Sequence, residues 1–384
     1  MNKIFKLFLS IILNFSIVSF SLSAEETKIK IGLLVPLTGN NSEIGNQIVK
    51  SVQLALKDIN NNQIEIFPRD TQSNPDVTLR SATELQQNGI NLVIGPIFYE
   101  SLANLDQVSD MTFLSLTNKT LDLPKNVISS GINSTSQINA IKKFLELKEI
   151  QKSIFLIPNL NYDLEIEKGI KLSKIKFFKK YHYDIEPTKL TKQIEKITNY
   201  KIRKQNLIDE ITRLENSDDP VKERKIENLK KRYTLGSLKF DSVIITDFDE
   251  SLKSVITSLL YSDVSPEDFH LITLNQWFDE SLLKETNLQP IYYPSINKKN
   301  LDKFKEKFFE EFGLNTNYLS LLSYDLVGLI YYLSLSNNLK EISKSFKSKN
   351  SFKGKIGIFD IENNKINHRL NFYQVDKGLL KEIF

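Results

Sequence analysis

Apolar and polar residues follow two periods along the chain, and together they predict a repeated strand–helix pattern. Residues 29–35 form a nearly continuous apolar run before Pro36, which is typical of a buried parallel strand. Residues 44–59 then place apolar side chains at helical spacing. Similar cycles follow, with strands predicted at 64–67, 92–96 and 112–116 and helices from about residues 76 and 100.

A second set of alternating segments begins with a helix near residue 134. Its predicted strands are residues 153–158, 175–183, 241–246 and 270–274. Neighbouring parallel strands need crossover connections, and these are usually helices, so the pattern predicts an α/β protein with two doubly wound lobes. The length of 384 residues also favours two lobes over a single core.

Residues 188–236 interrupt this pattern with a highly charged segment. Apolar residues recur in it at spacings of three and four, and residues 216–220 break the rhythm before it resumes. This spacing predicts an antiparallel helical hairpin that projects from the second lobe. Two interpretations remain open: the hairpin is a solvated insertion without a role, or it is an arm that docks a partner protein.

The N-terminal residues 1–24 have the pattern of a signal peptide. Lys3 and Lys6 precede an apolar run over residues 7–20, and the small residues Ser21, Ser23 and Ala24 follow. We expect cleavage near Ala24, export to the periplasm and no transmembrane segment in the mature chain, because no other long apolar stretch occurs. An uncleaved leader that tethers the protein to the inner membrane is the alternative.

The composition narrows the possible chemistry. The chain has no cysteine, which excludes disulfides, thiol nucleophiles and a lipoprotein anchor. Its net charge of +4 falls to +2 without the leader, so nothing favours nucleic acid as a partner. The three histidines lie far apart in sequence. We therefore expect no metal, no cofactor and no enzymatic activity.

Two local patterns resemble catalytic motifs. Ser173 and Lys176 form an S-x-x-K sequence, but the S-D-N and K-T-G motifs that accompany it in serine acyl enzymes are absent. Asp247 and Asp249 form a carboxylate pair at a predicted strand end, where capping of the following helix is the simpler role. We expect no catalytic residue at either place.

Loops at the carboxyl ends of the predicted strands are the best candidates for ligand binding, because open α/β sheets bind ligands there. Hydroxyl and backbone N–H groups in these loops suit a polar ligand, although each residue is equally consistent with helix capping. The candidate residues of the cleft are Thr38, Gly39, Phe98, Tyr99, Ser101, Ser115, Thr117, Asn118, Tyr162, Asp247 and Trp277.

The ordered set of segments resembles the type 1 periplasmic binding proteins of the leucine-binding family. The residues that carry the resemblance are the opening strand and loop at 31–39, the helix at 54–60, the motifs at 69–75 and 88–96, and the late segments 324–327 and 352–357. The resemblance implies two Rossmann-like lobes joined by three crossings. It places residues 27–133 and 294–368 in one lobe and residues 134–293 and 369–384 in the other.

Within this family, residues 95–98, 274–279 and 323–326 are similar to proteobacterial penicillin-binding protein activators. This likeness implies a partner of a peptidoglycan synthase, in which the cleft holds an amino acid, a cell-wall fragment or no ligand. The alternative is the substrate-binding subunit of an amino-acid ABC transporter, which would dock a permease. In that case Ser101, Ser115 and Thr117 would hold the ligand carboxylate, and Asp247 or Asp279 its ammonium group.

Overall fold

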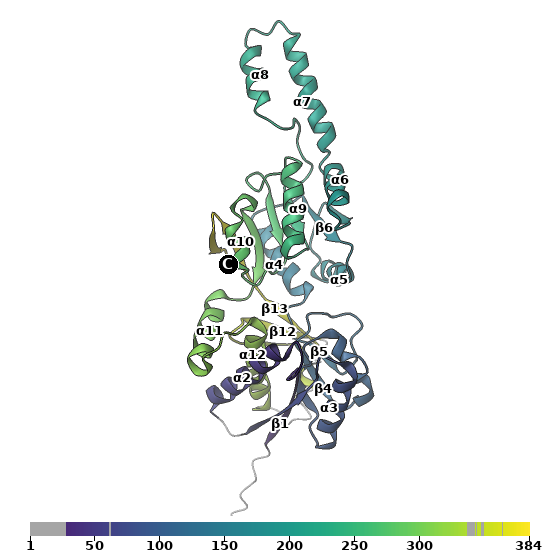
Figure 1. Cartoon of the computed structure of the whole chain (residues 1–384), viewed down its shortest axis with the longest axis vertical. Coiled ribbons are helices and arrows are strands. Elements are labelled where there is room, and N and C mark those ends of the chain that lie inside the picture. The colour runs from purple at the N-terminus through teal and green to yellow at the C-terminus, as the bar shows by residue number, and fades with distance from the viewer. Residues whose placement is uncertain (1–27, 61–62, 336–341, 343, 347–348, 363) are drawn as a thin grey trace, which may run out of the picture.

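The computed structural model describes residues 28–60, 63–335, 342, 344–346, 349–362 and 364–384. Two α/β lobes lie along the long axis of the molecule, and a pair of helices projects beyond the second lobe (Figure 1). The predicted leader at residues 1–24 lies outside the described residues. Within the described ranges, no helix combines the length and the apolar character needed to cross a bilayer.

The first lobe is built on an eight-stranded sheet in the order β11-β12-β13-β5-β4-β3-β1-β2. The strands from β13 to β2 run parallel, and β11 and β12 are antiparallel to their neighbours. These strands are β1 (Ile29–Val35), β2 (Ile64–Asp70), β3 (Leu92–Ile94), β4 (Thr112–Ser115), β5 (Val127–Ser129), β11 (Asn350–Lys353), β12 (Ile358–Glu362) and β13 (Lys365–Arg369).

Helices cover both faces of this sheet because successive strand residues point to opposite sides. In β4, Leu114 packs with α2 (Ser42–Ile59) and α12 (Tyr318–Ser334), to which α11 (Lys298–Phe312) is adjacent. Phe113 packs on the other face with α3 (Pro75–Gln87) and the 3₁₀ turns η1 (Tyr99–Leu102) and η2 (Leu105–Val108). The nearly unbroken apolar run in β1 is therefore buried on both sides.

The second lobe has a seven-stranded sheet in the order β15-β14-β10-β9-β8-β6-β7. The strands from β10 to β7 are parallel, and β14 and β15 are antiparallel. These strands are β6 (Ser153–Pro158), β7 (Lys179–Tyr183), β8 (Ser242–Ile245), β9 (His270–Thr273), β10 (Ile291–Ser295), β14 (Asn371–Asp376) and β15 (Leu379–Glu382). The helices are α4 (Ser134–Leu147), α5 (Asp163–Ser173), α6 (Pro187–Ile197), α9 (Asp249–Tyr261), α10 (Glu280–Lys284) and the 3₁₀ turn η3 (Thr286–Leu288).

The predicted α/β class with two lobes and mostly parallel sheets is confirmed. Local details differ at two places. The strand predicted at 175–183 begins only at Lys179, since the preceding apolar residue Ile175 is buried beside α5 in an irregular segment. The helix expected near residue 100 is replaced by η1 and η2, which are short 3₁₀ turns.

The charged segment contains three helices. Its first helix, α6, belongs to the body of the second lobe, because Leu190 and Ile194 are buried in a core shared with α9. The helices α7 (Tyr200–Glu215) and α8 (Lys222–Lys230) pack against each other and project from the lobe (Figure 1). We refer to residues 200–230 as the arm.

Three crossings connect the lobes, at residues 130–133, 296–297 and 370, and hydrogen bonds join them. His368 Nε2 lies 2.8 Å from the carbonyl oxygen of Ser130, and Asn133 Nδ2 donates to the Ile366 carbonyl at 3.0 Å, so the first and third crossings are tied together. The Tyr373 hydroxyl donates to the Ile296 carbonyl at 2.9 Å next to the second crossing.

His368 makes the stability of this hinge dependent on pH. Burial lowers the pKa of the His368 imidazole from 6.5 to about 4, so the folded protein holds it neutral. The stability that the folded protein gains from holding this imidazole neutral is fully present above pH 6.5 and is lost as the pH falls towards 4. Between pH 7 and about pH 5, we expect the free energy of unfolding to fall by about 2 kcal/mol because of this group.

Denaturant titrations of the wild type and of His368→Gln at both pH values test this prediction. Glutamine does not titrate, so the variant should show less of the loss than the wild type. His182→Gln is the matched control, because the His182 side chain is 38% exposed. An equal loss in the wild type and His368→Gln would contradict the prediction.

Candidate functional site

A cleft of about 270 Å³ lies between the lobes at the carboxyl ends of β3 and β4. The first lobe lines it with residues 97–100 and 116–119, the start of α12 and Ile356, and the second lobe contributes Trp277. The turn after β3 passes very close to β1: a Cβ atom on Gly95, whose φ is +98°, would lie 2.2 Å from the Leu34 carbonyl oxygen. Only glycine fits this approach, which brings residues 97–100 into the cleft.

Five of the predicted site residues line this cleft. Phe98 and Tyr99 come from the loop after β3, Thr117 and Asn118 from the loop after β4, and Trp277 from the loop after β9. Most of the other lining residues are apolar, including Ile97, Leu116, Ile132, Leu319, Leu322 and Ile356. The sequence therefore indicated the right loops of the first lobe. It did not indicate the apolar lining residues of α12, nor Ile132 and Ile356.

The remaining candidates of the first lobe have other partners. Thr38 lies beside exposed Gly39 in the loop after β1, and its hydroxyl donates to the Asp70 carboxylate at 2.5 Å. The Ser115 hydroxyl donates to the Pro96 carbonyl at 2.7 Å and is fully buried. Ser101 is 1% exposed. None of these four is among the residues that line the cleft.

Tyr162 and Asp247 of the second lobe hydrogen-bond to each other rather than facing the cleft. The Asp247 carboxylate accepts the Tyr183 hydroxyl at 2.6 Å, the Tyr162 hydroxyl at 3.2 Å and the Phe248 N–H at 2.9 Å. Burial and this carboxylate raise the pKa of both tyrosines, which stay protonated donors. Asp247 is only 3% exposed. Tyr183 was not indicated by the sequence, since it looks like an ordinary strand residue.

Two expected roles of acidic residues need correction. Asp247 does not cap α9, because Phe248 precedes that helix and no side chain caps it. Asp279, the other candidate for an ammonium group, caps α10 by accepting the Ser281 N–H at 2.9 Å and the Ser281 hydroxyl at 2.6 Å. Both carboxylates predicted to hold an amino-acid ammonium group are thus already hydrogen-bonded within the second lobe.

The indole of Trp277 lines the cleft and reaches the first lobe. It stacks on the Tyr318 ring of the first lobe, with centroids 3.4 Å apart and planes 10° from parallel. Trp277 and Phe278 both have positive φ angles, 52° and 61°, which turn the chain into the cleft. Sequence reasoning named Trp277 but missed Tyr318, because nothing local links residues on two different lobes.

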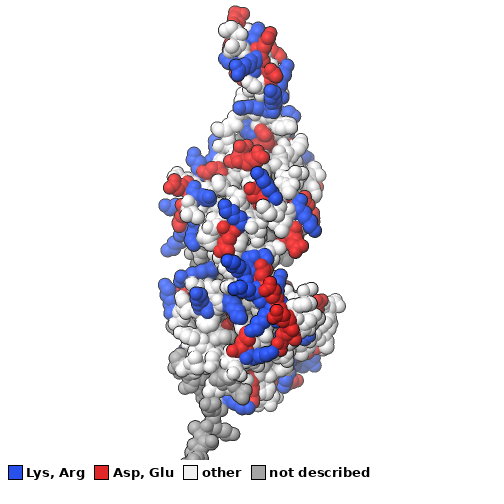
Figure 2. Space-filling view, turned by 90° about the vertical axis from the view of Figure 1, so that its left-hand side faces the viewer, with Lys and Arg blue, Asp and Glu red and all other residues white. Residues whose placement is uncertain are grey.

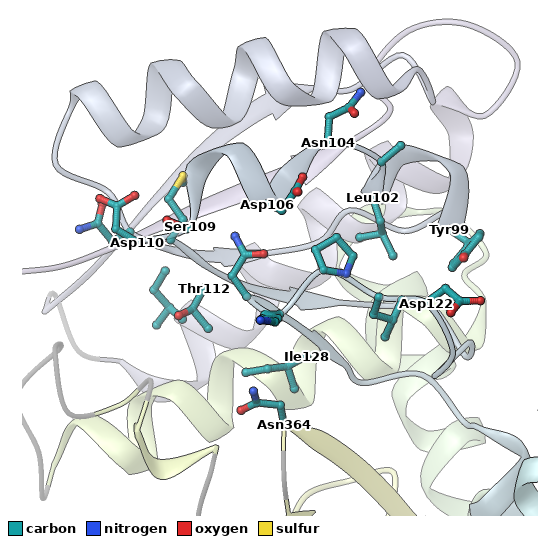
Figure 3. Close-up of a pocket in the computed structure, with 18 of the residues that line it drawn as sticks. Tyr99, Leu102, Asn104, Asp106, Ser109, Asp110, Thr112, Asp122, Ile128 and Asn364 are labelled. Carbon is teal, nitrogen blue, oxygen red and sulfur yellow. The ribbon is translucent and has the colours of Figure 1, made fainter.

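A second, wider groove of about 1470 Å³ lies in the first lobe beside η1 and η2 (Figure 3). Residues from β3, β4 and β5 line it, among them Leu92, Thr112 and Ile128. Its charged residues balance: four are basic (Lys28, Lys30, Lys119, Lys125) and four are acidic (Glu100, Asp106, Asp110, Asp122). Tyr99 and Lys119 also line the cleft, and the Lys119 Nζ lies 4.4 Å from the Tyr99 ring centre.

The described residues offer little reactive chemistry. No group of three or more histidine, cysteine or acidic side chains in the described part of the chain is arranged to hold a metal ion. Ser173 is 6% exposed, and its hydroxyl donates to the Ile170 carbonyl at 3.0 Å at the end of α5. On the face shown in Figure 2, basic and acidic side chains are intermixed over the lobes and the arm.

These features define a two-lobed α/β fold with a cleft between the lobes, and comparisons agree. Residues 28–171 match the periplasmic binding protein family. The C-domain of LpoA (YraM) from Haemophilus influenzae, a regulator of PBP1A, is 14% identical with a TM-score of 0.61, over 92% of this chain and 100% of that chain. LivJ from Streptococcus pneumoniae, bound to isoleucine, is 16% identical with a TM-score of 0.53, over 92% and 98%.

A substrate-binding protein of an ABC transporter from Desulfitobacterium hafniense, in complex with Leu, is 13% identical with a TM-score of 0.59, over 93% and 100% of the two chains. Curated protein sequences give no significant match. The chain therefore has the fold of type 1 periplasmic binding proteins, which is shared by a regulator of PBP1A and by substrate-binding proteins of transporters. These structural relatives are regulatory and binding proteins rather than enzymes.

Proposed function

We propose that the chain is an exported, periplasmic, non-enzymatic regulator that binds a peptidoglycan synthase of the penicillin-binding protein type. The observation that carries this proposal is that Asp247 and Asp279, the second-lobe carboxylates that an amino-acid binder would need for the ligand's ammonium group, are already hydrogen-bonded within that lobe. The acidic residue that lines the cleft, Glu100, is an exposed side chain of the first lobe, and an ammonium group enclosed without a charged partner is costly. Asp247 is held by Tyr162 and Tyr183, and the cleft lining is largely apolar.

The arm supplies a surface for such a partner. Its exposed apolar residues include Ile202, which is 62% exposed, and Ile208, which is 49% exposed, both on α7. The turn between α7 and α8 adds Val221 at 51%. Apolar side chains on a projecting helical pair are typical anchors of protein interfaces, where a few of them carry most of the affinity. The shared fold with the LpoA C-domain supports the same class of partner.

Charge substitutions on the arm test this proposal. We expect Ile202→Asp combined with Ile208→Asp to weaken binding to a bifunctional penicillin-binding protein from the same organism by about tenfold or more, because each removes apolar contact area. Binding is measured by biolayer interferometry with the mature chain. Both positions are exposed, so the melting temperature should stay the same.

Phe309→Asp is the matched control, since Phe309 is an apolar residue of α11 that is 54% exposed on the first lobe. Replacement of residues 207–232 by a short Gly-Ser linker is the second variant. It keeps Arg203 and Leu235, whose backbone groups are hydrogen-bonded at 2.9 Å at the base of the arm. Undiminished binding by both arm variants would contradict the proposed arm surface, and no binding by the wild type would contradict the synthase partner itself.

The second candidate is the substrate-binding subunit of an amino-acid ABC transporter. It is favoured by the cleft itself, in which Thr117 and Asn118 are polar lining residues, and by relatives in complex with isoleucine or leucine. Calorimetry with branched-chain and polar amino acids separates the two candidates. Binding at micromolar concentrations would favour the transporter subunit. If no amino acid gives a heat of binding, this second candidate is ruled out.

A further inference from the structure

We infer that the two lobes are held closed by contacts of the chain itself, with the Trp277 ring in the place of a ligand, so that no small molecule is needed for closure. This inference concerns the cleft and does not depend on the identity of the partner. Two separate contacts between the lobes carry it. One is a buried carboxylate latch, and the other is the aromatic stack.

The latch joins Glu165 of α5 to the loop after β4. Its carboxylate accepts the Thr120 N–H at 2.6 Å, the Leu121 N–H at 2.7 Å and the Thr120 hydroxyl at 2.8 Å. Lys168 Nζ, one turn further along α5, donates to the Thr120 carbonyl at 2.7 Å. Glu165 is 8% exposed, and an ionised carboxylate is rarely buried so deeply without such donors.

Opening the latch costs free energy because the Glu165 carboxylate is buried. If the lobes separated, the Glu165 carboxylate and two backbone N–H groups of the first lobe would lose their partners at once. The hydrogen bonds to a charged acceptor are the stronger kind, and several of them act together on a single residue. The carboxylate also holds the part of the loop that directly follows Thr117 and Asn118, which line the cleft.

The stack closes the cleft at a second place. Trp277 precedes α10, which lies on the opposite side of the second lobe from α5 in Figure 1. Its contact with Tyr318 spans the lobes, and burial raises the pKa of the Tyr318 hydroxyl. A ligand would have to displace a flat aromatic contact rather than water. Contacts on both sides of the crossings resist hinge opening more than either would alone.

Trp277 is the only tryptophan of the chain, so its fluorescence reports directly on the cleft. In the mature wild type without ligand, we expect a weak response to acrylamide quenching and a closed small-angle scattering profile. Neither should change when amino acids are added. The double variant Glu165→Ala/Tyr318→Ala should show several-fold stronger quenching and a larger radius of gyration.

Glu167→Ala with Tyr332→Ala is the matched control. Glu167 lies on the same helix but pairs with Lys180 within the second lobe, and Tyr332 is 57% exposed on α12. If the double variant unfolds, Thr120→Val, which removes only the hydroxyl donor, should still raise quenching. Three results would overturn the inference. They are an open wild type, a wild type that closes only with an amino acid, and latch variants whose acrylamide quenching and scattering match those of the wild type.

Discussion

Arg203→Ala is expected to detach the arm from the second lobe and to cost about 3 kcal/mol of local stability. Arg203 is 6% exposed, and its guanidinium lies between the arm and the end of α9. It donates to five acceptors: the carbonyls of Thr198, Ser262 and Asp263, the Thr234 hydroxyl and the Asp263 carboxylate. Alanine would leave these groups without their donor.

Hydrogen exchange resolved by residue is the suitable measurement, because the effect is local. Amide protection in α7 should fall by about a hundredfold, while protection in β6 and β8 stays near its wild-type level. Arg213→Ala is the matched control, since Arg213 lies on the same helix and pairs with Glu210 at an exposed site. Equal protection in the wild type and Arg203→Ala would show that the arm is held by other contacts.

Phe144→Ala should lower the free energy of unfolding of the whole protein by about 4 kcal/mol, because it empties the centre of an aromatic cluster. Phe144 of α4 is fully buried. Its ring stacks on Phe372 with centroids 4.4 Å apart and contacts Tyr292 at 5.1 Å and His270 at 6.0 Å. These neighbours lie on three strands of the second sheet, β14, β10 and β9.

Urea denaturation followed by circular dichroism measures this loss. Leu147→Ala, three residues further along the same helix, is the control because Leu147 is 58% exposed and should change stability by less than about 0.5 kcal/mol. A loss at Phe144 no larger than that at Leu147 would mean that the cluster does not support the second lobe.

The secondary structure of the lobes could be predicted because local signals agree there with the fold. The apolar run of β1 is buried on both faces of a parallel sheet, as its continuity indicated. Asn74 followed by Pro75 begins α3, and the Asn74 side chain accepts the N–H groups of Asp76 and Val77. Where side chains act only locally, spacing and capping were enough.

The charged segment shows where such reasoning ends. Its spacing of three and four residues predicted helices, but the same spacing describes α6, whose apolar face is buried in the lobe, and α7, which projects into solvent. Only contacts with α9 distinguish the two. The sequence did not indicate that Arg203 is buried either, because an arginine among lysines in a charged helix is expected to be exposed. Its burial depends on Asp263 and Thr234, which are distant in sequence and lie beside it only in the folded structure.

By itself, the sequence determined the strand–helix alternation, the loops that enter the cleft and the absence of thiol chemistry. The tertiary structure decided which of these groups are free to act. Asp247 looks available in the sequence but is held by two tyrosines, and Trp277 meets Tyr318 from the other lobe. The physical reason is that hydrogen bonds and ring contacts between distant segments depend on how the lobes pack, and neither composition nor periodicity records that packing.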